Sequence, residues 1–232
     1  MGTSVSTTTE RVDLGGRLPT MFGSTTLPSR IHDQLESAII TGTLQPGQRL
    51  HADDLAAHYG VSRIPVREAL RSLHEAGWVD IKPRHGVRVR ERSETELMEL
   101  FEFRAVVEDS VARWAAARRT DDQLATLQDA VDGEAAAVRR RDTDSLVLHT
   151  ARFHAALRAA AHNSVLEATS AEMEKRARFY FSTVAADLGD HWIEIHRELT
   201  ELVAASRARE AGKVAARHIA ETGAAVRSLL FP

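Results

Sequence analysis

Residues 93–231 contain no proline, and this absence limits the fold of the second half of the chain more than any other feature. Proline interrupts helices, so a proline-free stretch permits long continuous ones. Apolar residues recur there at helical spacing, without the alternation that strands show. Polar or glycine-containing breaks separate helical blocks at residues 94–118, 121–140, 143–161, 164–187, 190–208 and 211–230. The pattern predicts an all-α six-helix bundle.

Residues 27–92 have a different organisation. Helical periodicity covers residues 27–42, 52–59 and 63–76, with Ser62 as an N-cap before the third block and glycines ending each one. The segments "WVDIKP" and "GVRVRE" then alternate apolar and polar residues, as half-buried strands do. Helices across a glycine-containing turn, followed by a hairpin, predict a winged helix-turn-helix.

The predicted fold is therefore mainly α: an N-terminal winged helix-turn-helix followed by an all-α six-helix bundle. We divide the chain into residues 1–26, 27–92 and 93–232. The first segment is rich in Thr, Ser and Gly and has no apolar core, which predicts a flexible tail rather than a secretion signal.

Charge is distributed unevenly between the two predicted domains. Residues 62–92 hold eight basic and four acidic side chains, a net charge of +4, although the whole chain has a net charge of −3. Residues 93–232 hold 18 basic and 23 acidic side chains, a net charge of −5. The contrast suggests that only the N-terminal domain meets a polyanion. A mixed-charge helix with a solvated face is the alternative reading.

Composition excludes some functions. The chain has no cysteine, so it forms no disulfide and has no thiolate chemistry. This is compatible with a reducing cytoplasm. No apolar run has the length of a membrane-spanning helix, and we expect no membrane partner.

The predicted third helix carries residues suited to contact with DNA. The first turns of a recognition helix face base edges and phosphates in the major groove, and here they hold Ser62, Arg63, Pro65 and Arg67. The planar arginine fork pairs bidentately with guanine or phosphate, and a serine hydroxyl suits a phosphate oxygen. The hairpin tip "PRHG" places Arg84, His85 and Gly86 in a wing.

These motifs resemble the DNA-binding domain of the GntR family of bacterial transcriptional regulators. The similarity covers about residues 27–90 and includes "LQPGQRL", "GVSRIPVREAL", "GWV" and "RHGVRV". It implies a homodimer that binds a near-palindromic double-stranded operator, usually as a repressor. It also implies DNA contacts from Ser62, Arg63, Pro65 and Arg67, and from His85 and Gly86 in the wing.

One position departs from the family pattern. Some relatives contact DNA with a basic residue early in the second helix, but this chain reads "HADD" there. Asp53 cannot make that contact, and Arg49 and His51 are weaker candidates.

The helical half resembles the FCD ligand-binding domain of the FadR-like branch of this family. The similarity rests on four segments in this order: "FEFRAVVEDSVARWAA", "FHAALRAAAHN", "IEIHRELTELVAA" and "AARHI". It implies a small carboxylate effector, with Arg104, Asn163 and Arg178 as candidate contacts. An intrahelical pair between Arg104 and Glu108, and a helix-capping role for Asn163, are the alternative roles.

Three histidines lie beside apolar core positions on separate predicted helices: His154, His196 and His218. Three imidazoles that converge suit a divalent ion such as Zn²⁺ or Ni²⁺ and leave a coordination position open. Each is alternatively a hydrogen-bonded core histidine. The resemblance favours the metal site, but it also implies a further aspartate ligand four residues before His154, where this chain has Thr150. Glu108 is a possible substitute.

Three functions fit these observations. The first is a transcriptional regulator whose effector changes the placement of the two winged domains. The second is a metal-dependent hydrolytic enzyme with an attached DNA-binding module, although the chain lacks an "HExxH" run and no general base is assigned. The third is an architectural protein that binds DNA with little sequence preference. We expect the first and predict no catalytic residues.

Overall fold

The computed structural model describes residues 26–82, 86–181, 184 and 192–232. The predicted tail lies outside this part of the chain except for Thr26, and so do Arg84 and His85. Thr26 caps the first helix, because the Ser29 amide donates to its side-chain oxygen at 3.4 Å. Within the described residues no helix is both long and apolar enough to cross a membrane.

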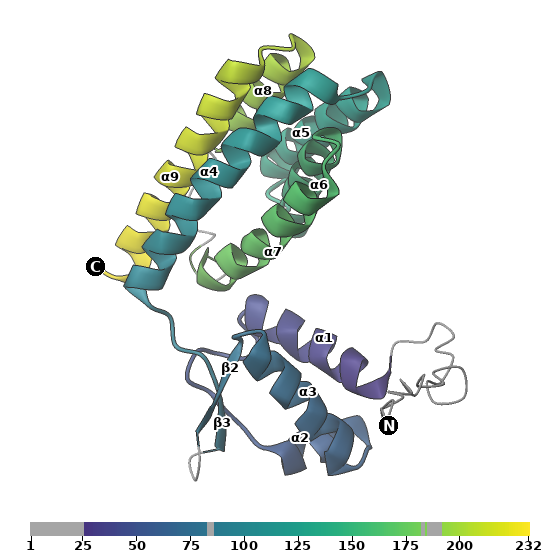
Figure 1. Cartoon of the computed structure of the whole chain (residues 1–232), viewed down its shortest axis with the longest axis vertical. Helices are drawn as coiled ribbons and strands as arrows, with labels where there is room; N and C mark the ends of the chain where they lie inside the picture. The colour runs from purple at the N-terminus through teal and green to yellow at the C-terminus, as the bar shows by residue number, and fades with distance from the viewer. Residues whose placement is uncertain (1–25, 83–85, 182–183, 185–191) are drawn as a thin grey trace, which may run out of the picture.

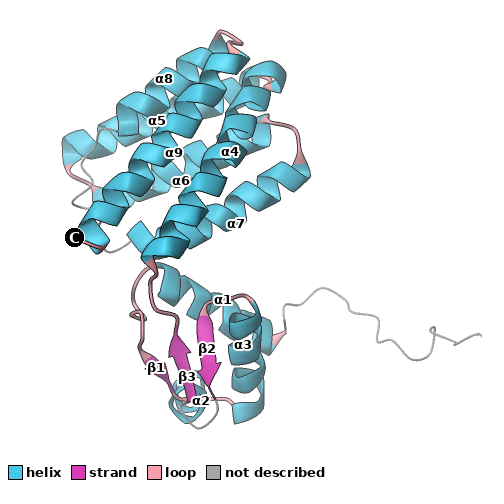
Figure 2. Cartoon of the chain, turned by 60° about the vertical axis from the view of Figure 1, so that its left-hand side comes forward, coloured by secondary structure: helices cyan, strands magenta, loops and turns pink. Residues whose placement is uncertain are grey.

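The N-terminal domain is a winged helix-turn-helix with a three-stranded antiparallel sheet (Figures 1 and 2). Its elements are α1 (Leu27–Ile40), β1 (Arg49–Leu50), α2 (Ala52–Tyr59), α3 (Arg63–Glu75), β2 (Val79–Lys82) and β3 (Gly86–Val89). The sheet order is β1-β3-β2, so the predicted hairpin is present. The strand β1 was not predicted from the sequence, because a strand of two residues shows no alternation of apolar and polar residues.

The α3 helix is held in place by its apolar face. Gly60 ends α2 with a φ of 65°, a left-handed conformation that favours glycine, and Ser62 then occupies the N-cap of α3. One side of α3 is buried against α1. The side chains that form this contact are Ile31, Leu35 and Ile39 on α1 and Val66, Ala69, Leu70 and Leu73 on α3. The opposite side of α3 stays exposed, with Arg63, Arg67 and Arg71 on it.

In the described part of the C-terminal domain, the chain forms the six helices that the sequence predicted. They are α4 (Glu94–Arg118), α5 (Asp121–Arg140), α6 (Thr143–Ala160), α7 (Ser164–Phe181), α8 (Trp192–Ala204) and α9 (Ala208–Leu230). The starts of α4 and α5 are fixed by side-chain caps from Ser93 and Thr120, the latter in a capping box with Gln123. The two longest helices, α4 and α9, lie side by side along the domain (Figure 1).

Helix boundaries differ from the prediction mainly around α8. The predicted block 190–208 is α8 over Trp192–Ala204, and α9 begins at Ala208 instead of residue 211. The chain turns between them at Ser206, which has a φ of 55°. Helical periodicity alone did not reveal this turn, because a single serine is also tolerated within a helix and the flanking residues are good helix formers.

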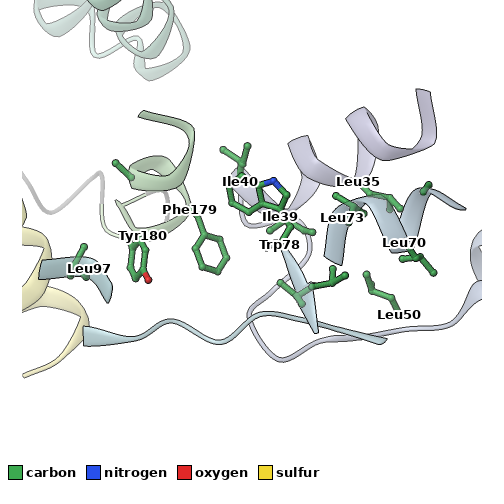
Figure 3. Close-up of a cluster of buried hydrophobic side chains, with 14 of the residues drawn as sticks. Leu35, Ile39, Ile40, Leu50, Leu70, Leu73, Trp78, Leu97, Phe179 and Tyr180 are labelled. Atoms are coloured by element: carbon green, nitrogen blue, oxygen red, sulfur yellow. The ribbon is translucent and has the colours of Figure 1, made fainter. Parts of the chain in front are cut away.

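The two domains share a continuous apolar cluster. Trp78, at the start of the hairpin, packs against Phe179 near the end of α7, with ring centroids 6.1 Å apart (Figure 3). The same cluster includes Ile40 of α1, Leu97 of α4 and Tyr180. The junction is therefore a packed interface in which α7 contacts the DNA-binding domain directly.

Candidate functional site

The exposed start of α3 carries the side chains predicted to contact DNA. Ser62 is exposed at the N-cap position, and its side chain makes no cap hydrogen bond within the described structure. Its hydroxyl is thus not committed to the helix. Arg63 and Arg67 are exposed and Pro65 is half-buried in the first turns. Their placement meets the requirement for groove contact, and the contacts themselves stay predictions.

Arg63 forms an ion pair with Asp53, the residue that the sequence analysis excluded from contact with DNA. Its Nε lies 2.7 Å from Oδ1 of Asp53, in the first turn of α2. Both side chains are largely exposed, at 70% and 62%. The departure from the family pattern therefore places a carboxylate against the first arginine of the recognition helix.

The described part of the wing is its base. Gly86 has a φ of 80°, which favours glycine, and a Cβ added there would lie 3.4 Å from the Nε of Arg49. The Arg49 guanidinium therefore lies beside the wing. Across the sheet, Arg88 donates to the carbonyl of Gly47 at 2.9 Å. The predicted contact from His85 falls outside the described residues.

The three predicted histidines converge inside the helical domain, one each from α6, α8 and α9. The ring centroids of His154 and His196 are 5.0 Å apart, and those of His196 and His218 are 5.3 Å apart. Phe153 stacks on His196 with centroids 4.0 Å apart. His196 is fully buried, and His218 is buried too.

Sequence reasoning missed a fourth member of this cluster, Glu134 of α5. The Nδ1 of His196 lies 3.0 Å from each carboxylate oxygen of Glu134, and both side chains are fully buried. Because a carboxylate only accepts, Nδ1 carries the proton and Nε2 presents a lone pair. That Nε2 is buried with no hydrogen-bond partner in the described structure. A signal was available, because Glu134 interrupts the apolar stripe of Leu127, Ala130, Val131 and Ala137 at helical spacing.

The donor set fits a divalent ion. Three imidazoles on one tetrahedral ion, with metal–nitrogen distances of about 2.0–2.1 Å, have ring centroids about 5 Å apart. The observed separations match this spacing, and the unpartnered Nε2 of His196 supplies a free ligand atom. Among the described residues, no three His, Cys, Asp or Glu side chains form a group placed to hold a metal ion as it stands.

His154 is held neutral, as a metal ligand must be. Burial is the largest cause that lowers its pKa well below the ordinary value, and electrostatic interaction with the neighbouring His196 and His218 acts in the same direction. Thr150, at the position where the resemblance implies an aspartate ligand, has a buried hydroxyl oxygen without a hydrogen-bond partner in the described structure.

A buried charged cluster adjoins the histidines. Arg158 of α6 forms an ion pair with Glu174 of α7, and the hydroxyl of Ser170 donates to Oε1 of Glu108 at 2.6 Å. Arg104 is 4% exposed, and its Nε has no hydrogen-bond partner in the described structure. The charges of Arg158 and Arg104 both contribute to the lowered pKa of His154. The histidines and these arginines therefore share one interior region.

Burial acts against the charge on Arg104. It is the largest cause that lowers the pKa of this guanidinium, and the carboxylates of Glu108 and Glu174 oppose it. The guanidinium carbon also lies 5.2 Å from the ring centroid of Phe101. Arg104 is thus a buried cation with unused hydrogen-bonding capacity. Glu108, the possible substitute metal ligand, instead accepts from Ser170.

The other two candidate effector contacts differ in placement. The Nε of Arg178 lies 3.7 Å from Oε1 of Glu174, at the edge of the charged cluster. Asn163 caps α7, because its side-chain oxygen accepts from the amide of Leu166 at 2.9 Å. This is the alternative role considered from the sequence. An effector contact by Asn163 stays a prediction without support from this geometry.

Comparison with known proteins finds a family match in each half of the chain. Residues 27–89 match the family described as "Bacterial regulatory proteins, gntR family", and residues 99–221 match the FCD domain. The chain is 33% identical over 140 residues to the Nta operon transcriptional regulator of Aminobacter aminovorans, covering 58% of this chain and 64% of that one. It is 28% identical over 172 residues to the galactonate operon transcriptional repressor of Escherichia coli, covering 66% and 74%.

A solved structure supports the assignment. The GntR transcriptional regulator from Rhodococcus sp. RHA1 superposes with a TM-score of 0.72 at 26% identity, covering 86% of this chain and 96% of that one. These relatives are regulators of transcription, and the hydrolase alternative has no support among them. The protein is a DNA-binding transcriptional regulator and not an enzyme. The chain belongs to the GntR family of bacterial regulatory proteins, with an FCD domain as its helical half.

Proposed function

We propose that the protein is a repressor whose operator binding is controlled by a small carboxylate held inside the FCD domain. The observation that carries the proposal is the buried Arg104, with an unpartnered Nε, beside three converging histidines. Burying a cation with unused donors is costly unless an anion pairs with it. One relative is named for a galactonate operon, and galactonate is a carboxylate. That relative is also named as a repressor.

The histidines are the proposed ligands of a zinc or nickel ion: His154, His196 and His218. Glu134 fixes the tautomer of His196, so that Nε2 is the ligand atom. Three protein ligands leave an open position, and the bound ion would supply it to a carboxylate oxygen of the effector. Arg104 would pair with the same carboxylate, because its charge lies near enough to His154 to contribute to the lowered pKa of that histidine.

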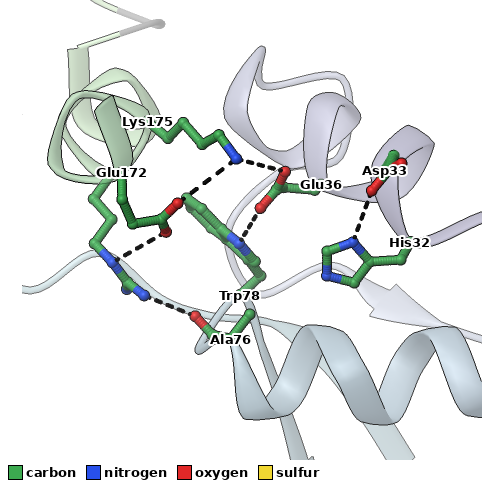
Figure 4. A network of polar contacts seen from close by, with 8 residues as sticks. His32, Asp33, Glu36, Ala76, Trp78, Glu172 and Lys175 are labelled. Atoms are coloured by element: carbon green, nitrogen blue, oxygen red, sulfur yellow. Dashed lines mark hydrogen bonds and ion pairs between the residues drawn. The ribbon is translucent and has the colours of Figure 1, made fainter. Parts of the chain in front are cut away.

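The α7 helix is the proposed link between effector and DNA. One face of α7 holds Ser170 and Glu174, which contact Glu108 and Arg158 in the interior. Another face contacts the DNA-binding domain (Figure 4): Lys175 lies 3.4 Å from Glu36, and Arg176 donates to the carbonyl of Ala76 at 2.9 Å. Rearranging the interior charges around a new anion would move α7 and, with it, the winged domain.

Trp78 completes this junction. Its indole N–H donates to the same Glu36 at 2.9 Å, and the Arg176 guanidinium lies 5.5 Å from its ring centroid (Figure 4). Further along α7, Arg92 of the interdomain segment donates to the carbonyl of Phe179 at 2.6 Å. The packed junction would transmit a displacement of α7 instead of absorbing it.

We also propose a homodimer, which places two recognition helices on a near-palindromic operator. The exposed side of α4 supplies an apolar surface, with Phe103 at 50% and Val106 at 67% exposure. As a regulator it acts on the chromosome, and we therefore place it in the cytoplasm. Replacement of Phe103 by glutamate should shift sedimentation from dimer to monomer, whereas the same change at Val165, 75% exposed on α7, should not. A Phe103→Glu protein that remains dimeric would exclude this surface.

The test begins with elemental analysis of untagged protein purified without chelator. We expect near-stoichiometric zinc or nickel, lost in His196→Ala and kept in His58→Ala, which alters an exposed histidine of the other domain. Operator binding is then measured by fluorescence anisotropy against a panel of small mono- and dicarboxylates that includes galactonate. We expect at least one to weaken binding in the wild type and to fail in Arg104→Gln.

The two measurements test the metal site, the class of effector and the direction of regulation separately. A protein without metal, even after loading, would disprove the metal site while leaving the Arg104 contact open to the carboxylate assay. Operator binding that no carboxylate changes would disprove the effector class. Operator binding strengthened by the carboxylate would disprove release as the regulatory direction.

A further inference from the structure

We propose that Asp53 positions Arg63 for base recognition and thereby raises the sequence specificity of the recognition helix. Asp53 lies in the first turn of α2, and Arg63 is the first residue of α3. Their side chains meet across the helix-turn-helix with Nε and Oδ1 2.7 Å apart. The pair thus lies on the surface that the fold presents to DNA.

The geometry determines which part of the guanidinium is available. The closest approach of Asp53 is to Nε. A carboxylate held at Nε leaves the end of the guanidinium with its two terminal nitrogens available as a fork. A fork of two terminal nitrogens can pair end-on with O6 and N7 of one guanine. Fixing Arg63 in this way lowers the conformational entropy that it loses on binding. Asp53 would therefore favour guanine at the position that Arg63 faces.

The charge of Asp53 acts in the same direction. An unpaired arginine at a helix start binds any phosphate and adds affinity without specificity. A carboxylate paired with the arginine weakens its contacts with phosphates, which lowers affinity for unrelated sequences more than affinity for a site that offers the base contact. Stability does not account for the pair, because ion pairs exposed to this extent contribute little to folding.

The chain provides a matched control at the next residue. Asp54 is exposed in the same turn of α2 and carries the same charge. Among the described residues it forms no ion pair with Arg63. Asp53→Asn and Asp54→Asn therefore remove the same charge from nearly the same place, and only the first breaks the pair.

The experiment uses the full-length protein and two duplexes. One carries the site that wild-type protein selects from a randomised pool, and the other is a shuffled duplex of equal composition. For Asp53→Asn we expect the ratio of the two affinities to fall about 5- to 150-fold through loss of one oriented base contact, with tighter binding to the shuffled duplex. We expect its salt dependence to steepen by about 0.9 as Arg63 gains a phosphate. Asp54→Asn should leave the ratio within twofold of the wild type, and Asp53→Glu should restore part of it.

Two further measurements test the assignment. In an Arg63→Gln background, Asp53→Asn should cause no additional loss of discrimination, because the residue that it positions is absent. A further loss would show that Asp53 reads DNA itself and would overturn the proposal, as would equal effects of Asp53→Asn and Asp54→Asn. Thermal melting should be similar for all variants. If wild-type protein selected no preferred site, the specific DNA binding on which the inference depends would itself fail.

Discussion

Glu134 gives the sharpest test of the histidine cluster, because its removal leaves a buried donor without an acceptor. Glu134 and His196 are both fully buried, with Nδ1 3.0 Å from each carboxylate oxygen. Losing the acceptor from a buried N–H costs about 1–3 kcal/mol. Loss of the buried methylene adds about 0.8 kcal/mol. We therefore expect Glu134→Ala to lower the free energy of unfolding by about 2–4 kcal/mol.

The assay is urea denaturation followed by far-ultraviolet circular dichroism, on chelator-treated protein so that metal binding does not contribute. For a chain of this size, about 3 kcal/mol corresponds to a melting temperature lower by roughly 6–12 °C. Glu134→Gln keeps one oxygen acceptor and should cost only about 1 kcal/mol. Asp132→Ala, exposed on the same helix, is the control and should stay within about 0.5 kcal/mol of the wild type.

The same pair of variants separates structure from metal binding. Because outer-shell carboxylates orient the ligating histidine, Glu134→Gln should weaken zinc binding by about 10- to 100-fold despite its small effect on stability. The reasoning is refuted if Glu134→Ala costs less than about 1 kcal/mol, since the buried N–H would then have another partner. If Glu134→Gln binds zinc as tightly as the wild type, the proposed role of Glu134 in metal binding is refuted.

Three further predictions concern the recognition helix, the buried Arg104 and the helical bundle. Arg67→Ala should lower operator affinity and reduce the slope of log affinity against log salt by about 0.9, if Arg67 meets a phosphate; unchanged binding in titrations would remove it from the contact surface. Arg104→Gln should weaken binding of a responsive carboxylate by about 10- to 150-fold in calorimetry, through loss of a charged hydrogen bond, and an unchanged affinity would contradict its role. Gly223→Ala should cost about 1–3 kcal/mol, because its Cβ would lie 2.7 Å from Phe101, and an unchanged melting temperature would show that α4 and α9 can separate.

The helices were predictable because their signals are local. In the structure, Ser93 and Thr120 cap α4 and α5 by accepting from backbone amides three residues further on, and the apolar stripes between them follow helical spacing. The strand β1 was not predictable in this way, because its two residues are ordered by pairing with Arg88 and Val87 from a distant segment. The turn between α8 and α9 was misplaced for a similar reason. Its left-handed residue is Ser206 instead of a glycine, so the sequence gives no local sign of it.

The candidate sites show the same limit at the level of side chains. Histidines beside apolar positions predicted a cluster, and the fold brings His154, His196 and His218 together. Their partner Glu134 was missed, although it lies on a buried stripe, because an acidic residue there reads equally as a break in the pattern. The Asp53–Arg63 pair was missed because the residues belong to two helices whose crossing sets the contact.

The proposed coupling through α7 depends on a packed domain junction instead of a flexible linker. Ser170 and Glu174 are four residues apart and share the face of α7 that points into the helical domain. Lys175 and Arg176 follow at once, about 100° further round per residue, and reach the DNA-binding domain. Buried charge and domain contact thus lie within one helical turn of a rigid element. In the proposed regulation, a free linker would let that helix move without consequence for α3, whereas the contact between Trp78 and Phe179 would carry the winged domain with it.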